Sequence, residues 1–218
     1  VVGLGSGTLR PNLSWTAAAG TLSVSAANCS FYNMVFTANF ADVTTMFDLT
    51  GAADYAAWEN CYFTDTSTIL NAIDVITAAT GADNLYWGNC KWNGASASND
   101  SFFTGVAHDG FYMDNCDIVS TVAQTAVVGL METSGNVTRC WIKDCHFFSN
   151  VDGALHLDFN GAANTGAVSH CWFGSIDTIG AVTAGFDLTG IHVYECYVAG
   201  DPDDYGLVGG GTLYNNAA

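Results

Sequence analysis

Apolar and polar residues alternate along short stretches of this chain, and the alternation restarts every 25–32 residues. A cysteine preceded by a polar residue marks each repeat, and an aromatic or aliphatic residue follows two positions later. Mostly apolar residues also recur three and five positions before each of these cysteines. Alternation with a period of two predicts β-strands with one buried face. The marker cysteines are Cys29, Cys61, Cys90, Cys116, Cys145, Cys171 and Cys196.

The parity of this pattern changes between the third position before each cysteine and the cysteine itself, so the chain must bend there. The residue just before the cysteine is Asn in four repeats and Asp, His or Glu in the other three. Asn tolerates left-handed backbone conformations and forms local hydrogen bonds, which suits a tight bend. We therefore expect a sharp bend immediately before each marker cysteine.

A second strand in each repeat carries one acidic residue between apolar neighbours, and a turn follows it. Met46–Gly51 and Gly185–Gly190 match almost residue for residue. Three shorter segments fit the same register, namely Ala72–Val75, Leu130–Thr133 and His156–Phe159. Each repeat is therefore expected to contain two clear strands and a short third one.

Repeats of this length, made only of short strands, predict an all-β parallel β-helix in which each coil stacks on the next. One coil cannot bury its own interior face, so about seven or more coils are expected to stack into a single domain over residues 1–218. A leucine-rich repeat is the competing solenoid, but it requires a Leu-x-x-Leu-x-Leu pattern that the sequence lacks.

Composition and charge exclude several classes of function. Half of the residues are hydrophobic and only 11% are charged, which excludes an intrinsically disordered chain. Twenty-one acidic and four basic residues give a formal net charge of −17, which argues against nucleic-acid binding and against docking on anionic membranes. We expect neither a transmembrane helix nor a signal peptide, because no apolar stretch is long enough and the N-terminus lacks a basic region.

The cysteines are expected inside the solenoid. The seven marker cysteines share the register of the apolar columns, and Cys140 takes an interior position that other repeats give to Leu or Phe. This predicts a column of buried, reduced thiols. Disulfides between stacked cysteines are the alternative. A zinc site at Cys140 and Cys145 is disfavoured, because Cys145 is expected to point inward and the adjacent His146 outward.

The acidic residues of the second strand are expected to form a stripe on one outer face. They are Asp48, Asp74, Glu132, Asp158 and Asp187. The simplest interpretation is a solvated face, and the alternatives are a stripe for cations or a basic partner and a pair of catalytic carboxylates. His156 is expected beside Asp158 on this face. We predict no catalytic residue, no metal ligand and no cofactor, since the chain offers almost no basic groups for lyase chemistry.

Gly20–Gly51, Ala95–Phe102 (ASASNDSF) and Ser149–Leu155 (SNVDGAL) are the most distinctive segments. They resemble virion proteins of tailed bacteriophages, and the likeness extends over most of the chain. The resemblance implies a right-handed parallel β-helix that decorates capsids as a trimer or forms spikes and fibres. No catalytic motif of a tailspike depolymerase can be carried over to any position here.

The predicted function is that of a structural virion protein, a capsid decoration protein on the head of a tailed bacteriophage. It would fold in the host cytoplasm and reside on the virion surface. The alternatives are a carbohydrate-binding or carbohydrate-cleaving tailspike or fibre, and a bacterial extracellular filament or surface protein. The expected partners are further copies of the chain in a homotrimer, and the major capsid protein or another virion protein.

Two features of the pattern suggest where such partners would bind. Tyr62, Trp172 and Tyr197 directly follow marker cysteines and are expected to point outward, where they could support subunit contacts. A solenoid also has two open ends. We expect a partner subunit to cover the segment Gly206–Tyr214 or the N-terminal end near Trp15.

Overall fold

The computed structural model describes residues 1–96, 101–121, 130–149, 156–175, 186–199, 207–208 and 212–214. This part of the chain is all β apart from one short 3-10 helix, η1 (Gly7–Leu9). Its strands form three sheets of eight, and every strand pairing within the sheets is parallel. Within the same ranges, no helix has the length and apolar character needed to cross a membrane.

The chain visits the three sheets in turn, so neighbouring strands of a sheet differ by three in number. Sheet 1 consists of β1 (Asn12–Trp15), β4 (Val35–Ala38), β7 (Tyr62–Asp65), β10 (Lys91–Gly94), β13 (Asp117–Ser120), β16 (His146–Ser149), β19 (Trp172–Ser175) and β22 (Tyr197–Ala199). Sheet 2 consists of β2 (Leu22–Val24), β5 (Val43–Leu49), β8 (Ala72–Ala78), β11 (Ser101–Gly105), β14 (Met131–Thr133), β17 (Leu157–Phe159), β20 (Phe186–Asp187) and β23 (Leu207–Val208). Sheet 3 consists of β3 (Ser30–Tyr32), β6 (Ala57–Glu59), β9 (Leu85–Gly88), β12 (His108–Asp114), β15 (Val137–Lys143), β18 (Gly166–Ser169), β21 (Ile191–Tyr194) and β24 (Thr212–Tyr214).

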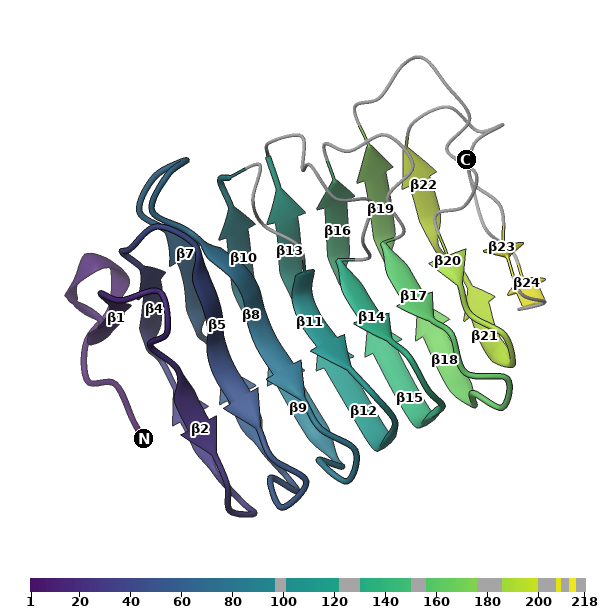
Figure 1. The fold of residues 1–218 in the computed structure, drawn as a ribbon. Coiled ribbons are helices and arrows are strands. Elements are labelled where there is room, and N and C mark those ends of the chain that lie inside the picture. The colour runs from purple at the N-terminus through teal and green to yellow at the C-terminus, as the bar shows by residue number, and fades with distance from the viewer. Residues whose placement is uncertain are drawn as a thin grey trace.

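Figure 1 shows the strands stacked side by side along a rod, from the purple N-terminal end to the yellow C-terminal end. The predicted all-β parallel solenoid is confirmed, since each turn of chain adds one strand to each sheet. Its right-handed winding stays a prediction. Stacking of turns is what creates the core, because the inward side chains of one turn are covered only by those of its neighbours.

The core is built from ladders of like side chains on successive turns. On the inner side of sheet 3, Phe31, Trp58 and Trp87 lie one above another. The ring centroids of Phe31 and Trp58 are 5.6 Å apart and those of Trp58 and Trp87 are 5.5 Å apart, with interplanar angles of 14° and 5°. Phe47 of sheet 2 packs edge-on against Trp58 of this ladder and edge-on against Phe63 of sheet 1. Stacked and edge-on contacts are the favoured geometries of aromatic pairs.

The bend predicted before the cysteines is confirmed. The residues that directly follow the strands of sheet 3 have left-handed backbones, with φ between 51° and 56°. They are Asn33, Asn60, Asn89, Asn115, Asp144, His170 and Glu195. Their side chains also bond along the column, since the Asn60 amide donates to Asn33 Oδ1 (3.0 Å) and the Asn115 amide to Asn89 Oδ1 (2.7 Å). Asn at this bend therefore provides both the conformation and a ladder of amides.

A second column of left-handed residues precedes sheet 3, and it corrects the interpretation of the first repeat. Asn28 belongs to this second column, at φ 62°. The backbone register places Cys29 beside Ala56, whereas Met34 lies beside Cys61. The two bends look alike in sequence, because each is a left-handed residue followed by an inward side chain. Cys29 is therefore outside the cysteine column, and Met34 takes its place.

The N-terminal end is covered in part by the chain itself. Val1–Gly3 lies along the outer edge of β3, with the Val1 amino group donating to the Ser30 carbonyl (2.6 Å) and the Gly3 N–H to the Tyr32 carbonyl (2.7 Å). Trp15 is buried against Phe36 and Phe47. Covering an edge strand in this way limits its pairing with other chains. At the other predicted contact end, Gly206–Tyr214, the described residues are β23 and β24, which are the last strands of sheets 2 and 3.

Candidate functional site

The outer face of sheet 2 carries most of the predicted acidic stripe, with one correction. Paired residues on successive strands run Asp48, Thr77, Thr104, Glu132, Asp158 and Asp187. Threonines therefore interrupt the acids for two turns, which spaces the like charges apart. The side chain of Asp187 lies outside the described part of the structure.

Asp74 does not belong to this column, contrary to the sequence prediction. It pairs with Thr45 on one side and Ser101 on the other. The cause is a change of parity inside the strand, where Val75 and Ile76 are both buried. In β8, Asp74 precedes the two consecutive buried residues, whereas in β5, Asp48 follows them. The two segments therefore look alike in sequence, although their acids occupy different positions in the sheet.

The acidic column borders a shallow groove of about 450 Å³. Asp48, Thr77, Thr104 and Glu132 line it, together with residues of the turns that follow the strands. The Thr77 hydroxyl donates to Asp48 Oδ1 at 3.5 Å, so the groove presents both hydroxyl and carboxylate groups. Such a surface can accept and donate hydrogen bonds, as hydroxyl-rich ligands require.

Two observations limit the chemistry of this groove. Glu132 and Asp158 lie on adjacent strands, about 4.8 Å apart, whereas Asp48 is three strands from Glu132, about 14 Å away. In the described ranges, no group of three or more His, Cys, Asp or Glu side chains is arranged to hold a metal ion. The two carboxylates that line the groove, Asp48 and Glu132, are therefore far apart, and no histidine lines it.

His156 was expected outward beside Asp158, and this expectation is wrong. His156 is 1% exposed and takes an interior position that Leu130 holds on the preceding turn. Its Nε2 lies 2.9 Å from the Gly174 carbonyl and its ring packs edge-on against Phe173. Burial lowers the pKa of His156 to about 4, so the ring is neutral near pH 7. It is a core residue with no access to the acidic groove.

The other histidines have structural partners. His108 is buried, with Nδ1 2.8 Å from the Ala82 carbonyl, and burial lowers its pKa. His170 occupies a bend and pairs with Glu195 of the next turn at 2.7 Å. His146 pairs with Asp117 at 3.1 Å on the outer face of sheet 1.

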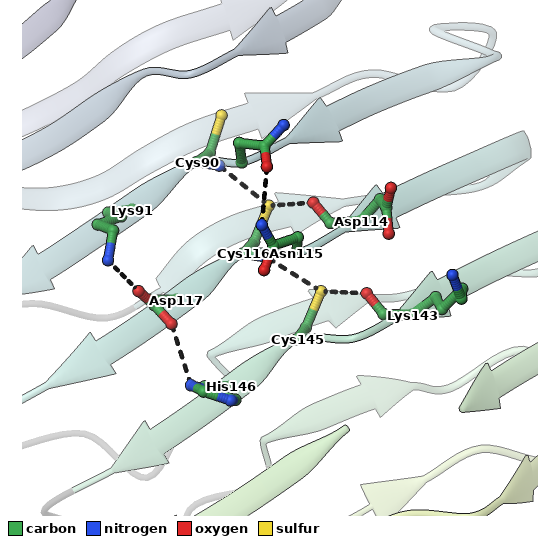
Figure 2. A network of polar contacts seen from close by, with 10 residues as sticks. Cys90, Lys91, Asp114, Asn115, Cys116, Asp117, Lys143, Cys145 and His146 are labelled. Atoms are coloured by element: carbon green, nitrogen blue, oxygen red, sulfur yellow. Dashed lines mark hydrogen bonds and ion pairs between the residues drawn. The ribbon is translucent and has the colours of Figure 1, made fainter. Parts of the chain in front are cut away.

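This pair is part of a polar ladder on sheet 1. Lys91, Asp117 and His146 follow one another on successive strands, and Asp117 bonds to both neighbours (Figure 2). The same outer column continues with Trp172 and then Tyr197, and Tyr62 precedes Lys91 in it. The three aromatics predicted to point outward thus flank a charged centre on one face.

Six cysteines form the interior column beneath the bend. They are Cys61, Cys90, Cys116, Cys145, Cys171 and Cys196. All six are buried, and all eight cysteines of the chain are thiols outside disulfides. The Cys90 N–H donates to Cys116 Sγ at 3.3 Å and the Cys116 N–H to Cys145 Sγ at 3.4 Å (Figure 2). Sulfur at this position accepts a backbone N–H at the bend while remaining compatible with an apolar core.

An aromatic notch on the outer face of sheet 3 was missed by the sequence analysis. It is an open depression of about 540 Å³ lined by Trp141, Gly166, Ala167, His192 and Tyr194. Trp141 and His192 are two strands apart, and the small Ala167 lies between them. Trp141 is 53% exposed. The sequence does contain a sign of it, since an aromatic residue recurs four positions before three of the cysteines. These residues are Tyr86, Tyr112 and Trp141, and they form a column that faces outward.

The geometry therefore offers three outer features: the groove of sheet 2, the charged and aromatic column of sheet 1, and the notch of sheet 3. None of them contains a nucleophile held by a histidine base among the described residues. The chain matches no protein-family model, no curated protein and no solved structure in these comparisons.

Proposed function

We propose that the chain is a structural subunit of a tailed-bacteriophage particle, a homotrimeric decoration protein on the head surface. The proposal rests on the sequence resemblance and on one observation, the outer column of sheet 1. A solenoid with regular outer faces suits lateral packing between copies or against a capsid lattice. Such a protein would fold in the host cytoplasm and act on the virion surface, and an extracellular filament is the alternative setting.

The sheet 1 column has the composition of a subunit contact. Tyr62, Trp172 and Tyr197 supply aromatic area, which is enriched at the centres of protein interfaces. The ladder of Lys91, Asp117 and His146 lies between them and holds three of the chain's few ion-pairing groups in one line. Aromatic surface supplies affinity, while fixed charges select one register between partners.

Self-assembly is the first expected result. Light scattering of the purified chain should give three times the 22.9 kDa mass of one chain. Trp172→Glu should convert the trimer to monomers, because it places a charge in the aromatic contact. Trp141→Glu is the matched control on sheet 3 and should leave the trimer intact. A wild-type chain that stays monomeric at high concentration contradicts the proposal, as does an electron-microscopy map of the particle that lacks the rod.

Carbohydrate binding is a second candidate, favoured by the notch on sheet 3. An exposed Trp ring beside a small residue can stack against the apolar face of a sugar ring, and His192 and Tyr194 provide polar groups nearby. The acidic chain favours neutral glycans over uronates. A glycan array followed by titration calorimetry should show binding that Trp141→Ala weakens at least tenfold and Trp172→Ala leaves unchanged. Equal binding by both variants would rule out the notch.

No cleavage of host polysaccharides is expected, whichever of these roles holds. General acid catalysis needs a carboxyl group kept protonated near neutral pH, and lyases need basic groups near the acids. Glu132 and Asp158 form the close carboxylate pair, and the groove has no basic side chain in its lining. A reducing-sugar assay should therefore remain at background. Turnover that disappears in Glu132→Ala or Asp158→Ala would replace the structural role with that of a depolymerase.

A further inference from the structure

The interior thiols form a continuous row of soft ligands along the axis of the solenoid. Six cysteines occupy equivalent positions on six successive turns, from Cys61 to Cys196. Figure 2 shows the sulfur atoms of Cys90, Cys116 and Cys145 following one another in a line. The sulfur of Cys116 accepts from the Cys90 N–H, and the sulfur of Cys145 accepts from the Cys116 N–H. Neighbouring strands of a sheet are about 4.7–4.9 Å apart, and that spacing is imposed on the sulfurs.

This spacing suits one particular coordination geometry. A bond between a d10 metal ion and a thiolate is about 2.3 Å long, as for Zn²⁺, so a linear sulfur–metal–sulfur unit spans about 4.6 Å. A disulfide fits less well, since it requires Cβ atoms about 3.8 Å apart. A tetrahedral site is also disfavoured, because no group of three or more metal-binding side chains converges in the described ranges.

We propose that the thiol ladder binds soft monovalent ions of the Cu⁺ type, each held linearly between two successive sulfurs. Soft thiolates select such ions over Mg²⁺ or Ca²⁺. Six thiols leave five gaps, and each inner sulfur bridges two ions. Binding releases the thiol protons to solvent and transfers no electrons. Five monovalent ions balance five thiolates, so one end thiol keeps its proton and the filled ladder carries no net charge, which keeps the cost of burial low.

The environment of the sulfurs supports this assignment. Each sulfur lies in a dry, pre-formed row, so an ion pays little to order its ligands. The Cys90 and Cys116 N–H groups already donate to the sulfurs of the next turn at 3.3 and 3.4 Å, and hydrogen bonds of this kind favour a thiolate over a thiol. Cys140 is equally buried but lies in a different column, between Phe111 and Gly166, and it supplies a matched control.

The test counts the ions lost on removing single thiols. The reduced full chain is loaded with Ag⁺ in chloride-free buffer, both as folded protein and during refolding, against competing glutathione, and the ions are counted by native mass spectrometry. Relative to the wild type, Cys116→Ser should lose two ions because it interrupts two gaps, and Cys196→Ser should lose one. Cys140→Ser should lose none. X-ray absorption should show two sulfur neighbours per ion.

Binding of one ion by each thiol independently predicts a loss of one ion in all three variants, which would overturn the proposal. Retention of no ions against glutathione, in either loading protocol, would also overturn it. Serine at position 116 preserves an acceptor for the Cys90 N–H, and circular dichroism confirms folding of each variant. Cys116→Ala is the second variant for the same position and should also lose two ions.

Discussion

Replacing Trp87 by alanine is expected to lower the free energy of unfolding by about 3–5 kcal/mol, the range for large aromatic side chains in a core. Trp87 is fully buried and stacks on Trp58, and the rings of Phe103 and Phe111 pack against it at 5.4 and 5.0 Å. Turns above and below lose contacts together, because the ladder is continuous. The melting temperature should fall on the order of 10 °C, measured by circular dichroism.

A phenylalanine at the same position separates packing from polarity. The indole Nε1 of Trp87 is buried and has no hydrogen-bond partner among the described residues. Trp87→Phe removes this unsatisfied donor and keeps an aromatic ring, so it should cost clearly less than the alanine variant. Tyr86→Ala, one residue earlier on the outer face, is the control and should change stability little. For a chain of this size, a loss of 1 kcal/mol lowers the melting temperature by at least about 2 °C. A Trp87→Ala protein whose melting temperature lies within about 2 °C of the wild type would therefore contradict the ladder model.

Lowering the pH from about 6.5 to 4 is expected to destabilise the fold through His156. Its pKa is about 4 in the folded chain because burial disfavours the charged ring, and about 6.5 when unfolded. The unfolded state therefore binds the extra proton in this interval, so stability falls as the pH falls. The loss at pH 4 amounts to about 3 kcal/mol, since one pKa unit corresponds to about 1.4 kcal/mol.

His156→Leu should remove this pH dependence, because leucine already occupies the equivalent place at Leu130. Urea unfolding of both proteins at pH 7, 5.5 and 4 isolates the effect as the difference between the two curves. Protonation of the many acidic groups affects both proteins alike and cancels. His192→Leu, at an exposed position of sheet 3, should follow the wild type. Parallel curves for wild type and His156→Leu would show that His156 does not titrate in this way.

The three outer features also differ in what they require of the chain. The groove and the notch could bind a ligand in a single copy of the chain, whereas the column of sheet 1 acts only in contact with a second copy. The variants Trp172→Glu and Trp141→Ala therefore separate assembly from ligand binding. The thiol ladder is independent of both, since its sulfurs face the interior.

Sequence alone was sufficient for the parallel solenoid, for the left-handed bend and for the burial of six of the seven marker cysteines. These features repeat on every turn, so each copy of the pattern supports the others. Asn60, Asn89 and Asn115 show this directly, because a residue suited to positive φ recurs next to the same inward cysteine.

Only the tertiary structure decided which equivalent positions lie side by side. Cys29, Asp74 and His156 were all misplaced by the sequence, and each lies next to a bend or to two consecutive buried residues where the parity of the strand changes. A change of parity exchanges inside for outside without altering the local pattern of letters. Backbone pairing with the neighbouring turn, 25 or more residues away, removes that ambiguity. The notch beside Trp141 also depends on pairing between turns, because it exists only where the small Ala167 lies between large residues on the preceding and following turns.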